Sequence, residues 1–175
     1  VLIDEALAAL RAITERYRGR VVKTIGDEVM CVFANAERGF LAATDMQNSV
    51  NALPVVTDTK RMIRVGFHAG PVIEEKGDVF GDTVNVAARM AGLAKGMQIM
   101  TSGSTVESLP PALRSATRAI ATVAVKGKAD EMTVYEVLWQ DSDDVTMAAS
   151  SLNLGDSSVE LVLRHASREI ILGAG

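Results

Sequence analysis

Apolar residues recur at every third or fourth position in the first part of the chain, which is the spacing of one face of an α-helix. The members of this face are Ile3, Ala6, Leu7, Leu10, Ile13 and Tyr17. Gly19 then supplies a stop, so we expect the first helix to end before it. The same spacing predicts a second helix over residues 36–53, ended by Pro54, a third over residues 82–94, and a small one over residues 104–109.

Between these helices the pattern changes to the two-residue period of β-strands. Residues 21–24 and 29–33 flank a tight turn at Gly26 and predict an antiparallel hairpin. Residues 63–70 alternate between apolar side chains and other types, so His68 is interpreted as a sheet-face residue and not a ligand. Shorter strands are expected at residues 98–101, 119–125 and 133–138. Hairpins among long helices predict an α+β sandwich, with a mostly antiparallel sheet, helices on one face and the other face bare.

The last part of the chain has a different composition. Residues 140–158 are polar and rich in Ser and Asp, as in a linker. Residues 159–175, which include "VELVLR", are expected to begin a further β element. This element faintly resembles the opening strands of a forkhead-associated domain, a family that binds phosphothreonine peptides. Because the chain starts at Val1 already in a helical pattern, we interpret the sequence as an internal fragment.

Composition narrows the class of protein. The chain has 175 residues, 48% hydrophobic and 23% charged, which is typical of one globular domain. A net charge of −4 argues against a nucleic-acid binder, because such proteins concentrate Lys and Arg on one face. The single cysteine, Cys31, excludes an internal disulfide and favours a reducing, cytoplasmic location, and we interpret it as a small apolar strand residue. No run of about 18 apolar residues occurs, so we expect no membrane contact from this fragment.

Three stretches carry residues suited to chemistry: "KTIGDE" from Lys23, "GDVFGDTVNVAARM" from Gly77, and "VKGK" from Val125. Asn85 and Arg89 are four residues apart, so they share a helix face and could clamp one ligand. Taken alone, each stretch has a simpler interpretation as a Gly-Asp turn, a solvated arginine or a Lys-Gly-Lys loop.

Together, the order and spacing of these motifs resemble the catalytic domain of class III nucleotidyl cyclases, the adenylate and guanylate cyclases. The similarity covers residues 1–139. It implies a ferredoxin-like, palm-type sandwich whose first strand is missing from the fragment. It also implies an in-line attack of the ribose 3′-hydroxyl on the α-phosphate, with pyrophosphate leaving and with two divalent cations, Mg²⁺ or Mn²⁺, as cofactors.

The resemblance assigns expected roles to individual residues. Asp27 matches one of two metal-binding aspartates, and the second is expected upstream of Val1, on the missing strand. That departure leaves open whether the fragment is active by itself. Glu28, next to Asp27, is expected to point to the opposite face of its strand.

Lys23 and Asp78 match the base-recognition pair of the family. An ammonium donor and a carboxylate acceptor complement adenine, which accepts at N1 and donates from its 6-amino group, whereas guanine presents the reverse. The pair therefore predicts ATP over GTP.

Three further residues match the family's contacts to the rest of the nucleotide. Asn85 matches the residue that orients the ribose, Arg89 the one that binds charge at the α-phosphate, and Lys126 a triphosphate-binding lysine.

The family builds its active sites between two domains packed head to tail, and this sequence carries residues of both kinds. We therefore expect a symmetric homodimer that contacts through the bare sheet face. The predicted function is adenylate cyclase, making cyclic AMP from ATP. The alternatives are a guanylate cyclase and a catalytically silent, cyclase-like module that senses nucleotide or only dimerises. A diguanylate cyclase is disfavoured, because its Gly-Gly-Asp-Glu-Phe signature is not present.

Overall fold

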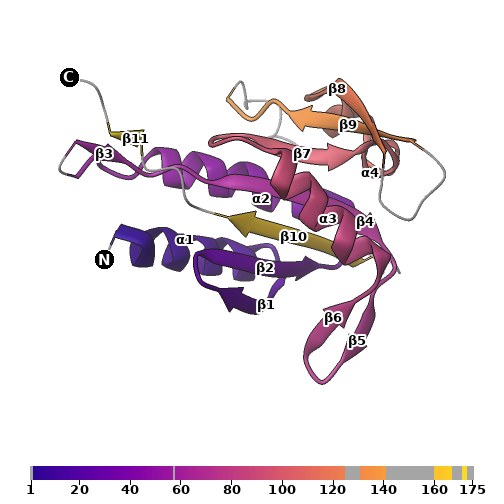
Figure 1. Ribbon diagram of the computed structural model, residues 1–175, viewed down its shortest axis with the longest axis horizontal. Coiled ribbons are helices and arrows are strands. Elements are labelled where there is room, and N and C mark those ends of the chain that lie inside the picture. The colour runs from indigo at the N-terminus through magenta and orange to yellow at the C-terminus, as the bar shows by residue number, and fades with distance from the viewer. Residues whose placement is uncertain (1, 57, 125–130, 141–159, 167–170, 173–175) are drawn as a thin grey trace.

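The computed structural model describes residues 2–56, 58–124, 131–140, 160–166 and 171–172. Its centre is a seven-stranded sheet in the order β1-β2-β10-β4-β7-β9-β8 (Figure 1). The strands are β1 (Arg20–Ile25), β2 (Glu28–Phe33), β4 (Arg64–Gly70), β7 (Ile99–Ser102), β8 (Thr117–Ala124), β9 (Glu131–Val137) and β10 (Glu160–Ala166). Every neighbouring pair is antiparallel except β4 with β7. The predicted α+β class with a mostly antiparallel sheet is confirmed.

Helices α1 (Leu2–Arg16) and α2 (Ala36–Asn51) cover one face of this sheet. Asn35 caps α2, because its side chain accepts a hydrogen bond from the backbone N–H of Arg38 at 2.9 Å. The main core lies between these helices and the sheet, where Phe40 of α2 meets Phe67 of β4 edge to face, with ring centroids 6.4 Å apart. The fully buried members include Leu10, Phe33, Phe40, Leu41, Met46, Ile63, Phe67 and Ile99.

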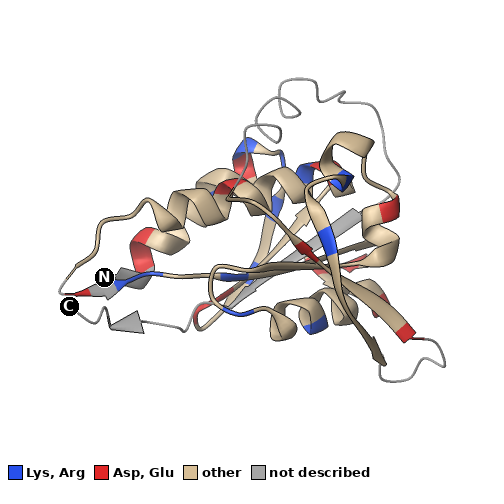
Figure 2. Cartoon of the chain, turned by 90° about the horizontal axis from the view of Figure 1, so that it is seen from above, with Lys and Arg blue, Asp and Glu red and all other residues tan. Residues whose placement is uncertain are grey.

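Helix α3 (Asp82–Leu93) lies on the other face, which corrects the expectation that all helices share one face and leave the second bare. Met30 and Val32 alternate with the core-facing residues of β2 and pack with Ala87 of α3. Gly66 of β4 allows α3 to pack on this face. A Cβ at Gly66 would lie 1.9 Å from the backbone nitrogen of Ala91, so the backbone of the helix lies in direct contact with the strand. Figure 2, turned by 90°, shows helices on both sides of the sheet.

A short hairpin that the sequence did not predict, β5 (Ile73–Glu75) and β6 (Asp78–Phe80), precedes α3 and projects from the body of the molecule (Figure 1). Its two turn residues, Lys76 and Gly77, both have positive φ, 52° and 78°, as a type I′ turn requires. The remaining elements are β3 (Thr59–Lys60), which pairs with β11 (Ile171–Leu172), and the short helices α4 (Gly103–Glu107) and α5 (Pro111–Arg114).

Strand β10 lies in the middle of the sheet, antiparallel to both β2 and β4. Because β1 and β10 are both antiparallel to β2, β10 runs parallel to β1 with β2 between them. The expected β element at 159–175 therefore has its first strand inside the same sheet as β4 and β7. Its assignment to a forkhead-associated domain stays a prediction. Apart from Gln140, the expected linker at 140–158 lies outside the described residues.

Candidate active site

A β-bulge in β1 sets the direction of Lys23. Val21 pairs with Cys31 but Lys23 pairs with Met30, so Val22 is an extra residue in the strand. Cys31 faces the core under α1 and α2, whereas Met30 faces α3. The bulge thus turns Lys23 to the face of the sheet on which α3 lies, whereas regular alternation from Val21 would have placed it on the core face under α1 and α2.

Regular alternation from Val21 places Val22 on the α3 face, and the bulge allows Lys23 to share that face with it: Val22 packs with Met30 and Val32, and Lys23 lines a cavity with Met30. Two consecutive side chains on one face is the signature of a bulged strand. Arg20, which pairs with Val32, also belongs to this face. The side chains of β1 that face α3 and the β5–β6 hairpin are therefore those of Arg20, Val22 and Lys23.

Lys23 meets Asp78, the first residue of β6. The Nζ of Lys23 lies 3.0 Å from Oδ2 of Asp78, and the backbone N–H of Val79 donates to Oδ1 at 2.8 Å. These two hydrogen bonds, the one from Lys23 first, hold the pKa of Asp78 below its usual range, so its carboxylate is charged at neutral pH. The structure therefore brings together the two residues of the predicted base-recognition pair.

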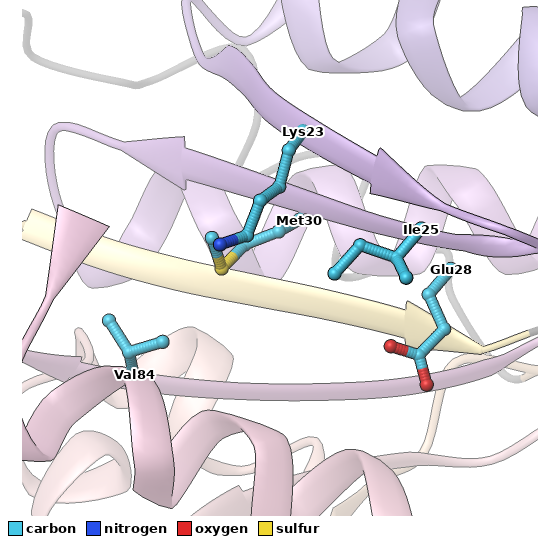
Figure 3. Close-up of a pocket in the computed structure, with 5 residues that line it drawn as sticks. All are labelled: Lys23, Ile25, Glu28, Met30 and Val84. Carbon is cyan, nitrogen blue, oxygen red and sulfur yellow. The ribbon is translucent and has the colours of Figure 1, made fainter. Parts of the chain in front are cut away.

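A cavity of about 110 Å³ opens beside this ion pair. It is lined by Lys23, Ile25, Glu28, Met30 and Val84, which point toward a common space in Figure 3. Sites for whole drug-sized ligands are typically about 300–1,000 Å³, so this cavity has room for a base-sized group only. Glu28 had no predicted role. Its alternation with Met30 along β2 is the sequence signal that could have placed it here.

Asp27 occupies the two-residue turn between β1 and β2. Gly26 precedes it with φ of 60°, which fits the first position of a type II′ turn. Carboxylate oxygen is a preferred ligand of Mg²⁺ and Mn²⁺. Within the described residues, however, no three His, Cys, Asp or Glu side chains are grouped closely enough to hold a metal ion. Asp27 is therefore one candidate ligand and not a complete metal site.

The strand next to this turn is β10, whose Ala166 pairs with Glu28. Its one acidic residue, Glu160, pairs with Gly70 and so lies at the far end of the strand from Asp27. By register, β10 brings no carboxylate to the turn, and the second metal-binding aspartate expected upstream of Val1 stays a prediction.

Asn85 and Arg89 lie one helical turn apart on α3, and both are exposed. They follow Val84, which lines the cavity. Among the described residues, neither side chain makes a hydrogen bond or an ion pair, so both polar groups are available to a ligand. The predicted triphosphate ligand Lys126 lies outside the described residues.

Two other candidate groups are structural. His68 is buried on the sheet face, as predicted, with Nδ1 at hydrogen-bond distance from the hydroxyls of Ser102 and Thr105. Cys31 is buried too, and burial raises the pKa of its thiol to about 11, which matches its interpretation as a small strand residue. Figure 2 shows basic and acidic residues interspersed along the described chain. No helix in the described part of the chain has the length and apolar composition that crossing a bilayer demands.

Comparison with known proteins decides the family. The family model of the adenylate and guanylate cyclase catalytic domain matches residues 1–138. The chain belongs to this family. The cyclase domain is 36% identical over 114 residues to an uncharacterised protein of Mycobacterium tuberculosis, and 31% identical over 112 residues to an adenylate cyclase of Glutamicibacter nicotianae. Each match covers 64% of this chain but only 29% and 27% of the relatives, so the chain spans less than a third of their length.

Solved cyclase structures share the fold. One of them is the catalytic core of a rhodopsin-guanylyl cyclase with converted specificity, in complex with ATPαS. Its TM-score is 0.69 at 30% sequence identity, and the match covers 77% of this chain and 78% of that structure's chain. The guanylate cyclase domain from Catenaria anguillulae, bound to GTP, has a TM-score of 0.63 at 28% identity, covering 77% and 80%. The relatives of this cyclase domain thus include proteins named for each of the two purine nucleotides.

Proposed function

We propose that this chain is the catalytic domain of an adenylate cyclase, which converts ATP to cyclic AMP and pyrophosphate. The observation that carries the proposal is the ion pair of Lys23 with Asp78 beside the cavity. An ammonium group donates only, and an ionised carboxylate accepts only. The lowered pKa of Asp78 keeps it in the accepting form. The pair therefore matches N1 and the 6-amino group of adenine and opposes O6 and N1–H of guanine.

The remaining predicted residues complete the proposed reaction. Asn85 would orient the ribose, and the guanidinium of Arg89 would bind the charge that develops at the α-phosphate. Lys126 would hold the triphosphate. Two divalent cations, Mg²⁺ or Mn²⁺, would neutralise phosphate charge when bound, with Asp27 as one ligand. Asp27 would be one of several ligands that such ions require.

The proposal includes a cytoplasmic, head-to-tail homodimer. Two observations support the dimer: the cavity beside Lys23 has room for a base only, and Asp27 is not among the residues that line it. A full site would then combine Asp27 of one protomer with Lys23, Asp78 and Arg89 of its partner. In such a dimer the β1–β2 hairpin serves two sites.

The proposed reaction is tested by incubating the purified protein with ATP and Mg²⁺ or Mn²⁺ and measuring cyclic AMP and pyrophosphate. Equal amounts of both products are expected. Release of ADP and phosphate, or binding of ATP without turnover, would contradict the proposal, and the second result would indicate a nucleotide-sensing module.

The proposed dimer is tested by mixing two inactive variants, Asp27→Ala and Arg89→Ala. If each site combines residues of two protomers, the mixed dimer contains one intact site, and the mixture should recover up to about a quarter of the wild-type activity. Recovery should not occur when each variant is assayed alone. A mixture that stays inactive, although sedimentation shows that subunits have exchanged, would contradict the shared site.

A further inference from the structure

The β5–β6 hairpin holds Asp78 away from the main sheet. Glu74, Glu75 and Lys76 are exposed, and the buried anchor of the hairpin is Val79, which packs with Met30 and Ala87. Figure 1 shows the hairpin extending beyond the end of α3. The position of Asp78 relative to Lys23 therefore depends on what fixes this hairpin against β1.

Arg20, the first residue of β1, contacts both halves of the hairpin. Its Nη2 lies 2.7 Å from Oε1 of Glu74 on β5, and its Nη1 donates to the backbone carbonyl of Gly77 at 3.0 Å. Gly77 is the second turn residue and directly precedes Asp78. A guanidinium can make both contacts at once because its donors form a rigid planar fork.

The bulge at Val22 is what allows Arg20 and Lys23 to act on the same hairpin. The two residues are three positions apart, so in a regular strand they would point to opposite faces. With the bulge, Arg20 pairs with Val32 and Lys23 with Met30, and both partners face α3. Two cations of β1 thus meet two carboxylates of the hairpin, Glu74 and Asp78.

We propose that Arg20 is a positioning residue for base recognition: by binding Glu74 and the carbonyl of Gly77, it fixes Asp78 at the distance from Lys23 at which both can reach one base. This inference rests on the proposed function of the Lys23–Asp78 pair. The side chains of Arg20 and Glu74 are 45% and 51% exposed, so the ion pair is screened by solvent and its effect is of moderate size.

The test compares Arg20→Ala, Glu74→Ala, the double variant and Arg20→Lys with the wild type, using ATP and GTP as substrates. For Arg20→Ala we expect KM for ATP to rise about three- to five-fold, with kcat within two-fold and a smaller preference for ATP, as for loss of an exposed ion pair. The double variant should be no worse than Arg20→Ala, because Glu74 acts through its contact with Arg20, which the single variant already removes. Arg20→Lys, which keeps the charge but not the fork, should fall between Arg20→Ala and wild type.

Arg118→Ala is the matched control. Arg118 is also an exposed arginine that binds one carboxylate, Glu136, through two nitrogens at 3.1 and 2.8 Å. It lies on β8, at the opposite edge of the sheet from β1. Its removal should leave KM and the preference for ATP unchanged.

The outcomes separate this inference from the proposed function. If the wild type is active and Arg20→Ala keeps its KM and its preference for ATP, the positioning role is wrong. A fall in kcat and melting temperature with unchanged KM would assign Arg20 a structural role and would also overturn the inference. If the wild type forms no cyclic nucleotide, the proposed function fails instead. The affinity for a fluorescent ATP analogue, measured by titration, then tests Arg20 by the same three- to five-fold difference.

Discussion

Helix α3 packs directly against β4 at Gly66, so adding a methyl group to Gly66 should force the helix and the strand apart. In Gly66→Ala, the new Cβ would lie 1.9 Å from the nitrogen of Ala91, 2.4 Å from its Cα and 2.5 Å from the carbonyl carbon of Met90. All three are backbone atoms, so no side-chain rotation can relieve the overlap. Ordinary contact begins at 3.4 Å, so strand and helix must separate by about 1.5 Å.

Such a shift should affect both stability and activity. Overpacking of this kind typically costs about 1–3 kcal/mol, and each kcal/mol lowers the melting temperature of a chain of this size by about 2–4 °C. We therefore expect a melting temperature about 2–12 °C lower. Helix α3 carries Asn85 and Arg89, and a displacement of about 1 Å at a catalytic group can reduce the rate about 100-fold. Thermal unfolding followed by circular dichroism and the rate of cyclic AMP formation are the two measurements.

Gly92→Ala is the control on the same helix. A Cβ at Gly92 meets nothing within 4 Å, so this change adds helix propensity without a clash. It should leave activity unchanged and stabilise the protein by about 0.5–1 kcal/mol. If Gly66→Ala has the melting temperature and the activity of the wild type, the close packing of α3 on β4 is refuted.

Three further predictions follow from the same geometry. Arg89→Ala should lower kcat about 100- to 1,000-fold, as for other lost transition-state donors, with a smaller change in KM in steady-state assays; an unchanged kcat would remove Arg89 from the reaction. The folded-state pKa of Asp78 is depressed, so its charge is present above the unfolded value, about 3.9, and is lost only as pH falls through the lower folded value. The ratio of KM for ATP between Asp78→Asn and wild type should therefore be constant from pH 8 to about pH 5, and a ratio that collapses near pH 6 would contradict the assignment. A chain ending at Gln140 loses β10 and leaves facing edges of β2 and β4 unpaired, so it should aggregate or lose cooperative urea unfolding; wild-type stability would show that β10 is dispensable.

Much of the fold follows from local patterns. The helix expected over residues 36–53 is α2 (Ala36–Asn51), and the hairpin around Gly26 is β1 and β2, because periodicity and turn residues are properties of adjacent positions. The β5–β6 hairpin was missed because its strands have three residues each, too few for an alternating pattern. The side of the sheet taken by α3 was missed because it depends on Gly66, which contacts a helix more than twenty residues away.

The candidate site divides in the same way. The identity of Lys23 and Asp78 as a pair came from motif resemblance, since the residues are 55 positions apart. Their contact also needs the bulge at Val22, and nothing in "RVVKTI" distinguishes a bulged strand from a regular one. The roles of Glu28 and Arg20 emerge only when the hairpins are seen together. The place of β10 could not be foreseen, because a strand pattern does not specify its neighbours.

The central claim is that Lys23 and Asp78 select adenine, and the ratio of kcat/KM for ATP to that for GTP tests it most directly. The account predicts a ratio of at least about 100 for the wild type. With guanine, the ammonium group of Lys23 would face the N1–H donor and the carboxylate of Asp78 would face the O6 acceptor, so neither could form its hydrogen bond. It also predicts that the ratio falls below 1 when the two charges are exchanged in Lys23→Glu/Asp78→Lys. A wild-type ratio of 1 or less, or a ratio that the exchange leaves unchanged, would contradict the claim.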